Sequence, residues 1–420
     1  MFFRNLPDGS ILARLSRAVS LERVTSNDTC DIIFDAAADM VFEAERRSLN
    51  GDLWEIFYAL AVAADENPLC HIFERTLIPE SFSRILARDI WARHKVITAV
   101  KSIIENDDLY QDLKPLTDFI PTNTARVSSA KNAYEGVVRL AAGIAEAETP
   151  EDMFRSVREF CAIYGSGIFA LNYAFKWNSA EKKLSAVDDV DSRTLDSLIG
   201  YQSQKNELLA NTDSFLRGYP ANNVLLYGDS GTGKSSSIRA LLNEPDFTGR
   251  GLRMIELRRD QFPDIPDVLA LIRERNYRFV VFMDDLSFEE FEVEYKYLKA
   301  LIEGGLELKP DNAVIYATSN KRHIIREVWA DRASSAEDVH GWDTMQEKRS
   351  LSDRFGTTIW YPSVNKADYI SMVKAIACEF GLVIDEAEME NLAMRWELAK
   401  GAFTGRTARQ FVYDMLRRGL

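Results

Sequence analysis

The sequence predicts an α/β fold with a parallel sheet and a phosphate-binding loop, preceded by a mainly helical N-terminal domain. Residues 228–236 read GDSGTGKSS, with a strand-forming run before them and helical spacing after them. The first half of the chain has few glycines, and its apolar residues recur at three-and-four spacing. The chain has 420 residues, too many for one ordinary core, so we expect two or three domains.

Helical spacing dominates the N-terminal half. A further helix is predicted to start at Thr149, because a threonine cap is followed by Pro150 and two acidic residues. The apolar run 168–177 and the segment 184–187 predict a β-hairpin, and the polar residues 188–197 predict a linker. The other helices are expected at residues 21–47, 53–63, 81–99 and 130–148.

Composition excludes several classes of protein. A net charge of −14 does not indicate a nucleic-acid-binding surface, which needs many Lys and Arg contacts to phosphates. No apolar run approaches the roughly 20 residues that span a bilayer, so we expect no membrane segment. The four cysteines are far apart and form no C-x-x-C pair, which predicts reduced thiols and a cytoplasmic location.

The glycine-rich stretch matches the pattern G-x-x-x-x-G-K-[ST] at Gly228, Gly233, Lys234 and Ser235. Glycines let the backbone approach phosphate oxygens, and the following helix directs its positive end at the same charge. Lys234 is predicted to reach the β and γ phosphates, and Ser235 to hold Mg²⁺. The other predicted phosphate-loop residues are Asp229, Ser230, Gly231, Thr232 and Ser236.

Two further strands are expected to deliver polar side chains to the same edge of the sheet. Residues 278–285 read RFVVFMDD, a buried strand that ends in Asp284 and Asp285. Ligands of parallel sheets bind at the carboxyl ends of the strands, so Asp284 is predicted to hold Mg²⁺. Residues 313–317 form the next strand and are followed by Thr318, Ser319 and Asn320. Asn320 is predicted to position the attacking water or to sense the γ-phosphate.

This combination resembles the AAA+ superfamily over about half of the chain, from residue 198 onward. Segments such as LIGYQSQK, DDLSFEE, SLSDRFG and TGRTARQF are also similar to the bacterial domain-of-unknown-function 815 family, regarded as AAA+-like ATP-binding proteins. The resemblance implies an AAA+-type fold with a C-terminal helical lid. The implied divisions are a helical domain at 1–165, a hairpin and linker at 166–197, a nucleotide-binding domain at 198–362 and the lid at 363–420.

The resemblance also implies roles for particular residues. The segment Ile199, Gly200 and Tyr201 is expected to lie against adenine, and ATP and Mg²⁺ are the implied ligands. Arg354 matches the arginine finger, which acts in trans and implies a homo-oligomer. Arg406 is the first choice for the lid arginine that approaches the γ-phosphate, and Arg409 is the alternative.

Asp285 occupies the position where many ATPases have a glutamate that polarises the attacking water. Because aspartate is one methylene shorter, slow hydrolysis is expected, and Glu289 or Glu290 are alternative bases.

Three functions remain open from the sequence. The first is an ATPase that remodels or loads a macromolecular client, with a protein client bound by the N-terminal helices. The second is an ATP-gated binding switch with slow or negligible hydrolysis. The third and weakest is a small-molecule kinase, since an arginine finger and a lid are not needed by a kinase.

Overall fold

The computed structural model describes residues 10–20, 27–65, 80–122, 131–187, 190–286, 310–320, 355–382, 384–401 and 403–418. The chain divides into two compact units. Unit 1 comprises residues 1–174, 186–190 and 274–277, and unit 2 comprises residues 175–185, 191–273 and 278–420. Within the described residues, no helix is both long enough and apolar enough to span a bilayer.

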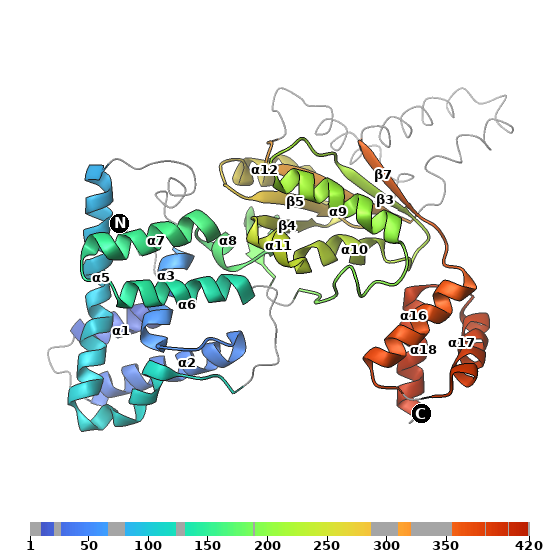
Figure 1. Ribbon diagram of the computed structural model, residues 1–420. Helices are drawn as coiled ribbons and strands as arrows, with labels where there is room; N and C mark the ends of the chain where they lie inside the picture. The colour runs from blue at the N-terminus through green and yellow to red at the C-terminus, as the bar shows by residue number, and fades with distance from the viewer. Residues whose placement is uncertain are drawn as a thin grey trace. The chain divides into compact units, whose positions relative to one another are not determined.

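Unit 1 is helical (Figure 1), and its described helices share a contiguous apolar core. Asp52 and Thr149 cap two of its helices, and the Thr149 hydroxyl accepts a hydrogen bond from the backbone of Asp152, as predicted. The helices are α1 (Ile11–Ser20), α2 (Asn27–Arg47), α3 (Leu53–Ala64), α5 (Glu80–Asn106), the 3-10 helix η1 (Asp108–Asp118), α6 (Lys131–Ala145), α7 (Pro150–Tyr164) and α8 (Ile168–Leu171).

Some elements before residue 175 differ from the sequence prediction. Helix α1 was not predicted, although its short amphipathic repeat buries Leu12 and Leu15. Residues 21–26 of the helix predicted at 21–47 lie outside the described residues. The first hairpin strand was predicted from residue 168, but residues 168–171 form a helical turn. A short apolar run cannot by itself distinguish a buried strand from a buried helical turn.

Unit 2 contains a seven-stranded sheet in the order β2-β1-β4-β5-β6-β3-β7. The pairs β4–β5, β5–β6, β6–β3 and β3–β7 are parallel. The strands are β1 (Ala174–Asn178), β2 (Lys183–Ala186), β3 (Val224–Gly228), β4 (Leu252–Leu257), β5 (Arg278–Met283), β6 (Ala313–Ser319) and β7 (Thr357–Tyr361).

Helices flank this sheet and also form a C-terminal group with its own apolar core. The flanking helices are α9 (Gln202–Leu216), α10 (Lys234–Ala240), η2 (Leu241–Asn243), α11 (Pro245–Gly249), η3 (Arg259–Asp264) and α12 (Ile265–Arg273). The C-terminal group consists of α16 (Lys366–Glu379), α17 (Glu386–Lys400) and α18 (Gly405–Arg418). The fold predicted from the sequence, an α/β fold with a parallel sheet, a C-terminal helical lid and a helical N-terminal region, is confirmed.

Strands β3, β5 and β6 position the site, because all three are parallel and adjacent. The register pairs Tyr227 with Ser319 and Met283 with Ala317, so the residues that follow these strands emerge at one edge of the sheet. Strand β5 is buried along almost its full length, as its continuous apolar sequence requires. The two carboxylates after it therefore lie beside the glycine-rich loop.

Candidate functional site

A cavity of about 510 Å³ opens beside the glycine-rich loop, between the sheet edge and the C-terminal helices of unit 2. It brings together fourteen predicted site residues that are dispersed over the sequence. These are Ile199, Tyr201, Ser230, Gly231, Thr232, Gly233, Lys234, Ser235, Ser236, Asp284, Asp285, Asn320, Arg406 and Arg409.

Three predicted residues do not line the cavity, and a fourth lies outside the described residues. Gly200 does not line the cavity, although Ile199 and Tyr201 on either side of it do. Gly228 and Asp229 also stand outside the lining, and their carbonyl oxygens accept hydrogen bonds from Lys234 Nζ at 2.9 and 2.6 Å. Arg354 lies outside the described residues, as do the alternative bases Glu289 and Glu290.

The conformation of the loop explains its glycines. Gly228 has φ +139°, and a Cβ atom there would approach the carbonyl oxygen of Tyr361 to 2.1 Å. Gly231 and Gly233 have φ values of +78° and +95°, which side chains rarely adopt. The backbone N–H of Gly405 in the lid donates to the carbonyl oxygen of Gly231 at 3.2 Å. The loop is therefore held on one side by β7 and on the other by the start of α18.

Lys234 is buried in this loop, with 4% of its surface exposed. Its ammonium donates to two carbonyl oxygens and, at 3.5 Å, to the Thr232 hydroxyl, all of which are neutral acceptors. Desolvation by burial lowers the pKa of Lys234 to about 8, although nearby aspartates oppose the shift. A buried cation surrounded by neutral acceptors is suited to receive an anion.

Asp284 is the centre of a hydrogen-bond network at the end of β5. Its Oδ1 accepts from the hydroxyls of Ser235 at 2.5 Å and Thr318 at 2.6 Å. Its Oδ2 accepts from Arg239 Nη2 at 3.0 Å, and the same nitrogen is 2.7 Å from Glu256 Oε1. The serine of the glycine-rich loop and the first carboxylate after β5, 49 residues apart, thus meet directly.

Asp285 and Asn320 form a second pair at the same edge. Asn320 Nδ2 donates to Asp285 Oδ1 at 2.5 Å, and the Asp285 backbone N–H donates to Thr318 Oγ1 at 2.9 Å. Asp285 has φ +57°, a left-handed conformation that is uncommon for a residue other than glycine. Strained backbone of this kind is concentrated at functional sites, where the surrounding contacts enforce it.

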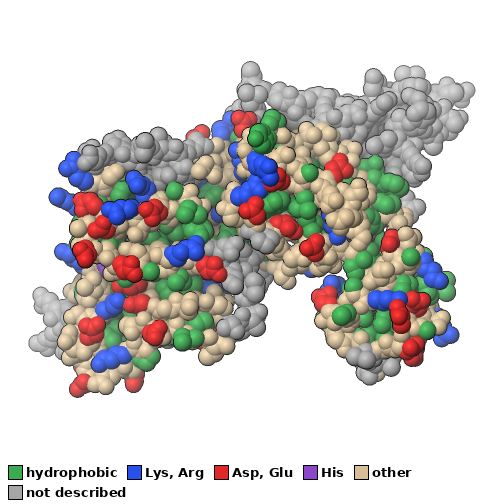
Figure 2. Space-filling model, viewed as in Figure 1, with side chains coloured by type: hydrophobic (Ala, Val, Ile, Leu, Met, Phe, Trp, Pro, Cys, Tyr) green, Lys and Arg blue, Asp and Glu red, His purple; other side chains and the backbone are tan. Residues whose placement is uncertain are grey.

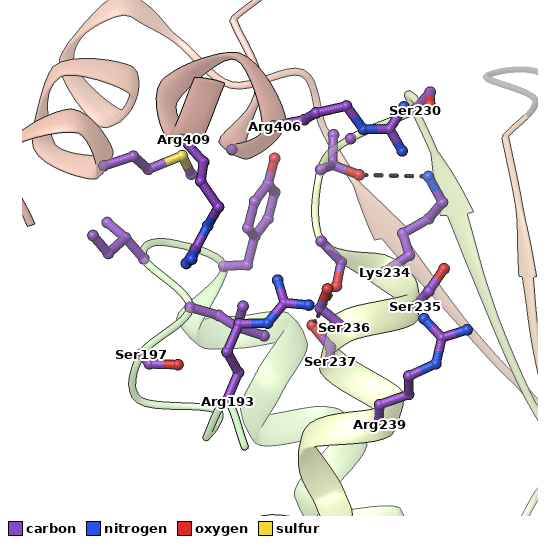
Figure 3. A pocket seen from close by; sticks show the side chains of 18 of the residues that line it. Arg193, Ser197, Ser230, Lys234, Ser235, Ser236, Ser237, Arg239, Arg406 and Arg409 are labelled. Carbon is purple, nitrogen blue, oxygen red and sulfur yellow. Dashed lines mark hydrogen bonds between the residues drawn. The ribbon is translucent and has the colours of Figure 1, made fainter. Parts of the chain in front are cut away.

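The two lid arginines take different positions around the cavity. In Figure 3, the side chain of Arg406 extends toward Ser230 in the glycine-rich loop, whereas Arg409 points into the cavity further from that loop. Arg409 also lies 3.6 Å from Glu379 and over the ring of Phe380. The Arg406 side chain is therefore the nearer of the two to the glycine-rich loop (Figure 3).

The segment predicted to contact adenine packs against the lid. Ile199 and Tyr201 lie against the apolar core of the C-terminal helices, and the hydroxyl of Tyr201 donates to the carbonyl oxygen of Pro362 at 2.8 Å. Met372 and Ile376 of α16 line the same part of the cavity. This end of the cavity is therefore more apolar than the end at the glycine-rich loop.

Sequence reasoning missed several lining residues. Arg193 and Ser197 fall in the segment predicted to be a linker. Lys205 ends the segment LIGYQSQK but was assigned no role, and Arg239 lies on α10 beyond the glycine-rich pattern. The complete lining carries six cationic side chains and two carboxylates, in a chain whose net charge is −14. The missed cations are thus the clearest sign, beyond the loop itself, that the cavity suits a polyanion.

Comparison with solved structures gives distant matches. The Holliday junction branch migration motor RuvB of Thermotoga maritima aligns at 18% identity and TM-score 0.37, covering 52% of this chain and 63% of RuvB. PCH-2 of C. elegans aligns at 15% identity and TM-score 0.33, covering 53% of this chain and 71% of PCH-2. Both TM-scores are below 0.5, so neither likeness bears on function.

No curated protein matches the sequence. A family model described as "Protein of unknown function (DUF815)" matches residues 170–418, more than half of the chain. The match includes the glycine-rich loop, both strand-end aspartates, Asn320 and the lid arginines. This chain belongs to the DUF815 family.

Proposed function

We propose that this protein binds Mg-ATP in the cavity and couples ATP hydrolysis to remodelling or loading of a macromolecular client. The 2.5 Å hydrogen bond between Ser235 and Asp284 carries the proposal. It places a hydroxyl and a carboxylate oxygen together, next to a loop shaped for phosphate. Mg²⁺ prefers such oxygen ligands and is usually shared between one or two protein side chains and substrate phosphates.

Each part of the chain has a distinct task in this proposal. Backbone N–H groups of residues 231–235 and the Lys234 ammonium bind the phosphates, and Ser235 and Asp284 hold the metal ion. Mg²⁺, when bound, supplies neutralisation of phosphate charge. Asp285 accepts a proton from the attacking water. Asn320 orients the Asp285 carboxylate through the hydrogen bond of 2.5 Å from its Nδ2 to Asp285 Oδ1.

Arginines complete the site in the same account. Arg406 approaches the γ-phosphate from the lid of the same subunit, in the direction that its side chain takes in Figure 3. Arg354 acts in trans, so the active species is a homo-oligomer. Positive charge at the transferring phosphoryl group stabilises the transition state and can be worth several powers of ten in rate.

The helical unit is the proposed binding region for a protein client. On the face shown in Figure 2, acidic and basic side chains of this unit are interspersed, which suits a protein partner better than a nucleic acid backbone. Exposed apolar side chains on it include Phe42, Ile120 and Ile163.

One observation favours the ATP-gated switch as a second candidate. Asp285 is shorter than the usual glutamate, and its carboxylate is engaged by Asn320 while its backbone is left-handed. These constraints limit how far the carboxylate can move toward a water molecule. In a switch, ATP would order the lid against the sheet and slow hydrolysis would reset it.

Magnesium dependence tests the proposal. We expect Mg²⁺ to strengthen ATP binding to the wild-type protein, measured by calorimetry with and without the metal. Ser235→Ala and Asp284→Asn should each abolish that gain, whereas Ser371→Ala, an exposed serine outside the cavity, should retain it. Equal magnesium effects in all four proteins would overturn the proposal.

Turnover separates the two candidates. A client-remodelling ATPase should hydrolyse ATP at a rate per subunit that rises with protein concentration and is lost in Arg354→Ala. A switch should retain nucleotide tightly with negligible turnover at every concentration.

A further inference from the structure

Arg193 is held at the cavity by contacts on both its side chain and its backbone. Its Nε lies 2.9 and 2.8 Å from the two carboxylate oxygens of Asp191, and Nη2 of the same guanidinium also donates to that carboxylate. The side-chain amide of Asn243 donates to the carbonyl oxygens of Asp191 at 2.6 Å and Arg193 at 2.7 Å. A polar segment that resembles a linker in sequence is thus fixed in place.

These contacts connect Arg193 to the helix that begins at the phosphate loop. Asn243 is the last residue of η2, which continues directly from α10, and α10 begins at Lys234. The arginine therefore has a defined position relative to the first turn of α10. A preorganised guanidinium loses less conformational entropy on binding than a mobile one.

Within the cavity, Arg193 and Lys234 lie at different ends of the loop. Figure 3 shows the Arg193 guanidinium reaching toward Ser236 and Ser237 in the first turn of α10, whereas Lys234 and Arg406 lie on the side of Ser230. In a loop of this kind, backbone N–H groups surround the α and β phosphates and the lysine reaches the β and γ phosphates. The end away from Lys234 is consequently the α-phosphate end.

The chemistry of arginine suits that position. Its guanidinium stays charged at every physiological pH and offers a planar set of donors that matches phosphate oxygens. The pair with Asp191 restricts the orientation of the guanidinium without removing it from the cavity lining. Neither the glycine-rich pattern nor the family resemblance assigned any role to this residue.

We infer that Arg193 binds the α-phosphate of the nucleotide, an inference that rests on the proposed binding of ATP. Arg193 would therefore contribute to the affinity for every adenine nucleotide that carries an α-phosphate. Arg406 would contribute only when a γ-phosphate is present. The contributions of the two arginines to affinity should therefore be distinguishable by comparing nucleotides with three, two and one phosphates.

Affinities for ATP, ADP and AMP, measured by competition with a fluorescent ATP analogue, test this inference. A charged hydrogen bond contributes about 1.5–3 kcal/mol, so Arg193→Ala should weaken ATP and ADP binding by the same factor, about tenfold or more, and AMP binding likewise. Arg406→Ala should weaken ATP binding much more than ADP binding. Arg217→Ala is the matched control, since Arg217 pairs with Asp213 on an exposed surface outside the cavity.

Loss confined to ATP in Arg193→Ala, or no loss at all, would overturn the inference. If Arg193→Ala is misfolded by circular dichroism, Arg193→Lys retains the charge and should still weaken ATP and ADP equally, though by less. Failure of the wild-type protein to bind ATP would remove the proposed function itself. If the wild-type protein binds ATP and the Arg193 variants bind nucleotides with the same affinity, only the role of Arg193 would be refuted.

Discussion

Thr318 should be a positioning residue for both strand-end aspartates, and its substitution by valine tests this. The side chain is 1% exposed, and its hydroxyl donates to Asp284 Oδ1 at 2.6 Å while accepting from the Asp285 backbone N–H at 2.9 Å. Valine has nearly the same shape but neither donates nor accepts. Thr318→Val therefore removes one hydrogen bond to a charged group and leaves one N–H without this acceptor.

The size of the effect follows from these two losses. A hydrogen bond to a charged group contributes about 1.5–3 kcal/mol, and an unsatisfied buried donor costs about 1–3 kcal/mol. Because the two losses share one hydroxyl and are not additive, we expect the free energy of unfolding to fall by about 3 kcal/mol. Thr318→Ser keeps the hydroxyl and loses one methyl group, for a cost of about 1 kcal/mol.

Urea unfolding and Mg-ATP titration together provide the assay. Thr318→Val should be less stable than Thr318→Ser and, at a temperature where both are folded, should bind Mg-ATP more weakly, because Asp284 is no longer held for the metal. Equal stability and equal Mg-ATP affinity of the two variants would refute this positioning role.

Three further predictions concern the loop, the lysine and the helical unit. Gly228→Ala should lower the free energy of unfolding by about 3 kcal/mol or more, because the added Cβ is strained by the left-handed backbone and also clashes with Tyr361. Gly233→Ala has the same kind of backbone but no atom near its added Cβ, so it should lower the free energy of unfolding by only about 1–2 kcal/mol. Equal urea midpoints of the two variants would contradict this prediction. Burial lowers the pKa of Lys234 to about 8, and ATP binding requires the charged ammonium. The ATP affinity measured by calorimetry should therefore fall as the pH rises through about 8. Lys234→Arg should not show this decline, because arginine keeps its charge at that pH. The buried carboxylate of Glu55 lies 2.7 Å from His94 Nε2 and 3.2 Å from Lys101 Nζ. Glu55→Ala removes this carboxylate from both partners and should lower the stability in thermal unfolding by about 3 kcal/mol. An unchanged midpoint would show that these contacts do not stabilise the fold.

The sequence was most informative where local chemistry and strand position coincide. The strand before Gly228, the apolar strand before Asp284 and the strand before Asn320 were all predicted, and the structure places the residues that follow them at one sheet edge. Such a juxtaposition is predictable because parallel strands share their carboxyl edge.

The missed residues depend on tertiary contacts that leave no local pattern. Arg193 lies in a polar stretch typical of a linker, and only the hydrogen bonds from Asn243 show that this stretch is fixed beside α10. The place of Arg239 in the cavity lining depends on its ion pairs with Glu256 on β4 and with Asp284 just after β5. The left-handed backbone of Asp285 is likewise invisible in the sequence, where aspartate carries no requirement for it.

The role of Arg354 and the division of the chain into domains stay predictions. Arg354 falls outside the described residues, so its proposed role as an arginine finger acting in trans depends on the turnover experiment with Arg354→Ala. The two compact units divide the chain within and around the hairpin, with residues 186–190 and 274–277 grouped with the helical unit.

ATP binding by Lys234→Ala is the most direct test of the central claim that the cavity is a nucleotide site. The Lys234 ammonium is buried among neutral acceptors, so its removal leaves no opposite charge unpaired in these contacts and should leave the fold intact. Loss of the ammonium should weaken Mg-ATP binding in calorimetry by tenfold or more, which corresponds to about 1.5 kcal/mol or more. Lys182→Ala, which alters an exposed lysine outside the cavity, should bind as the wild-type protein does. Unchanged Mg-ATP affinity in a folded Lys234→Ala protein would contradict the account.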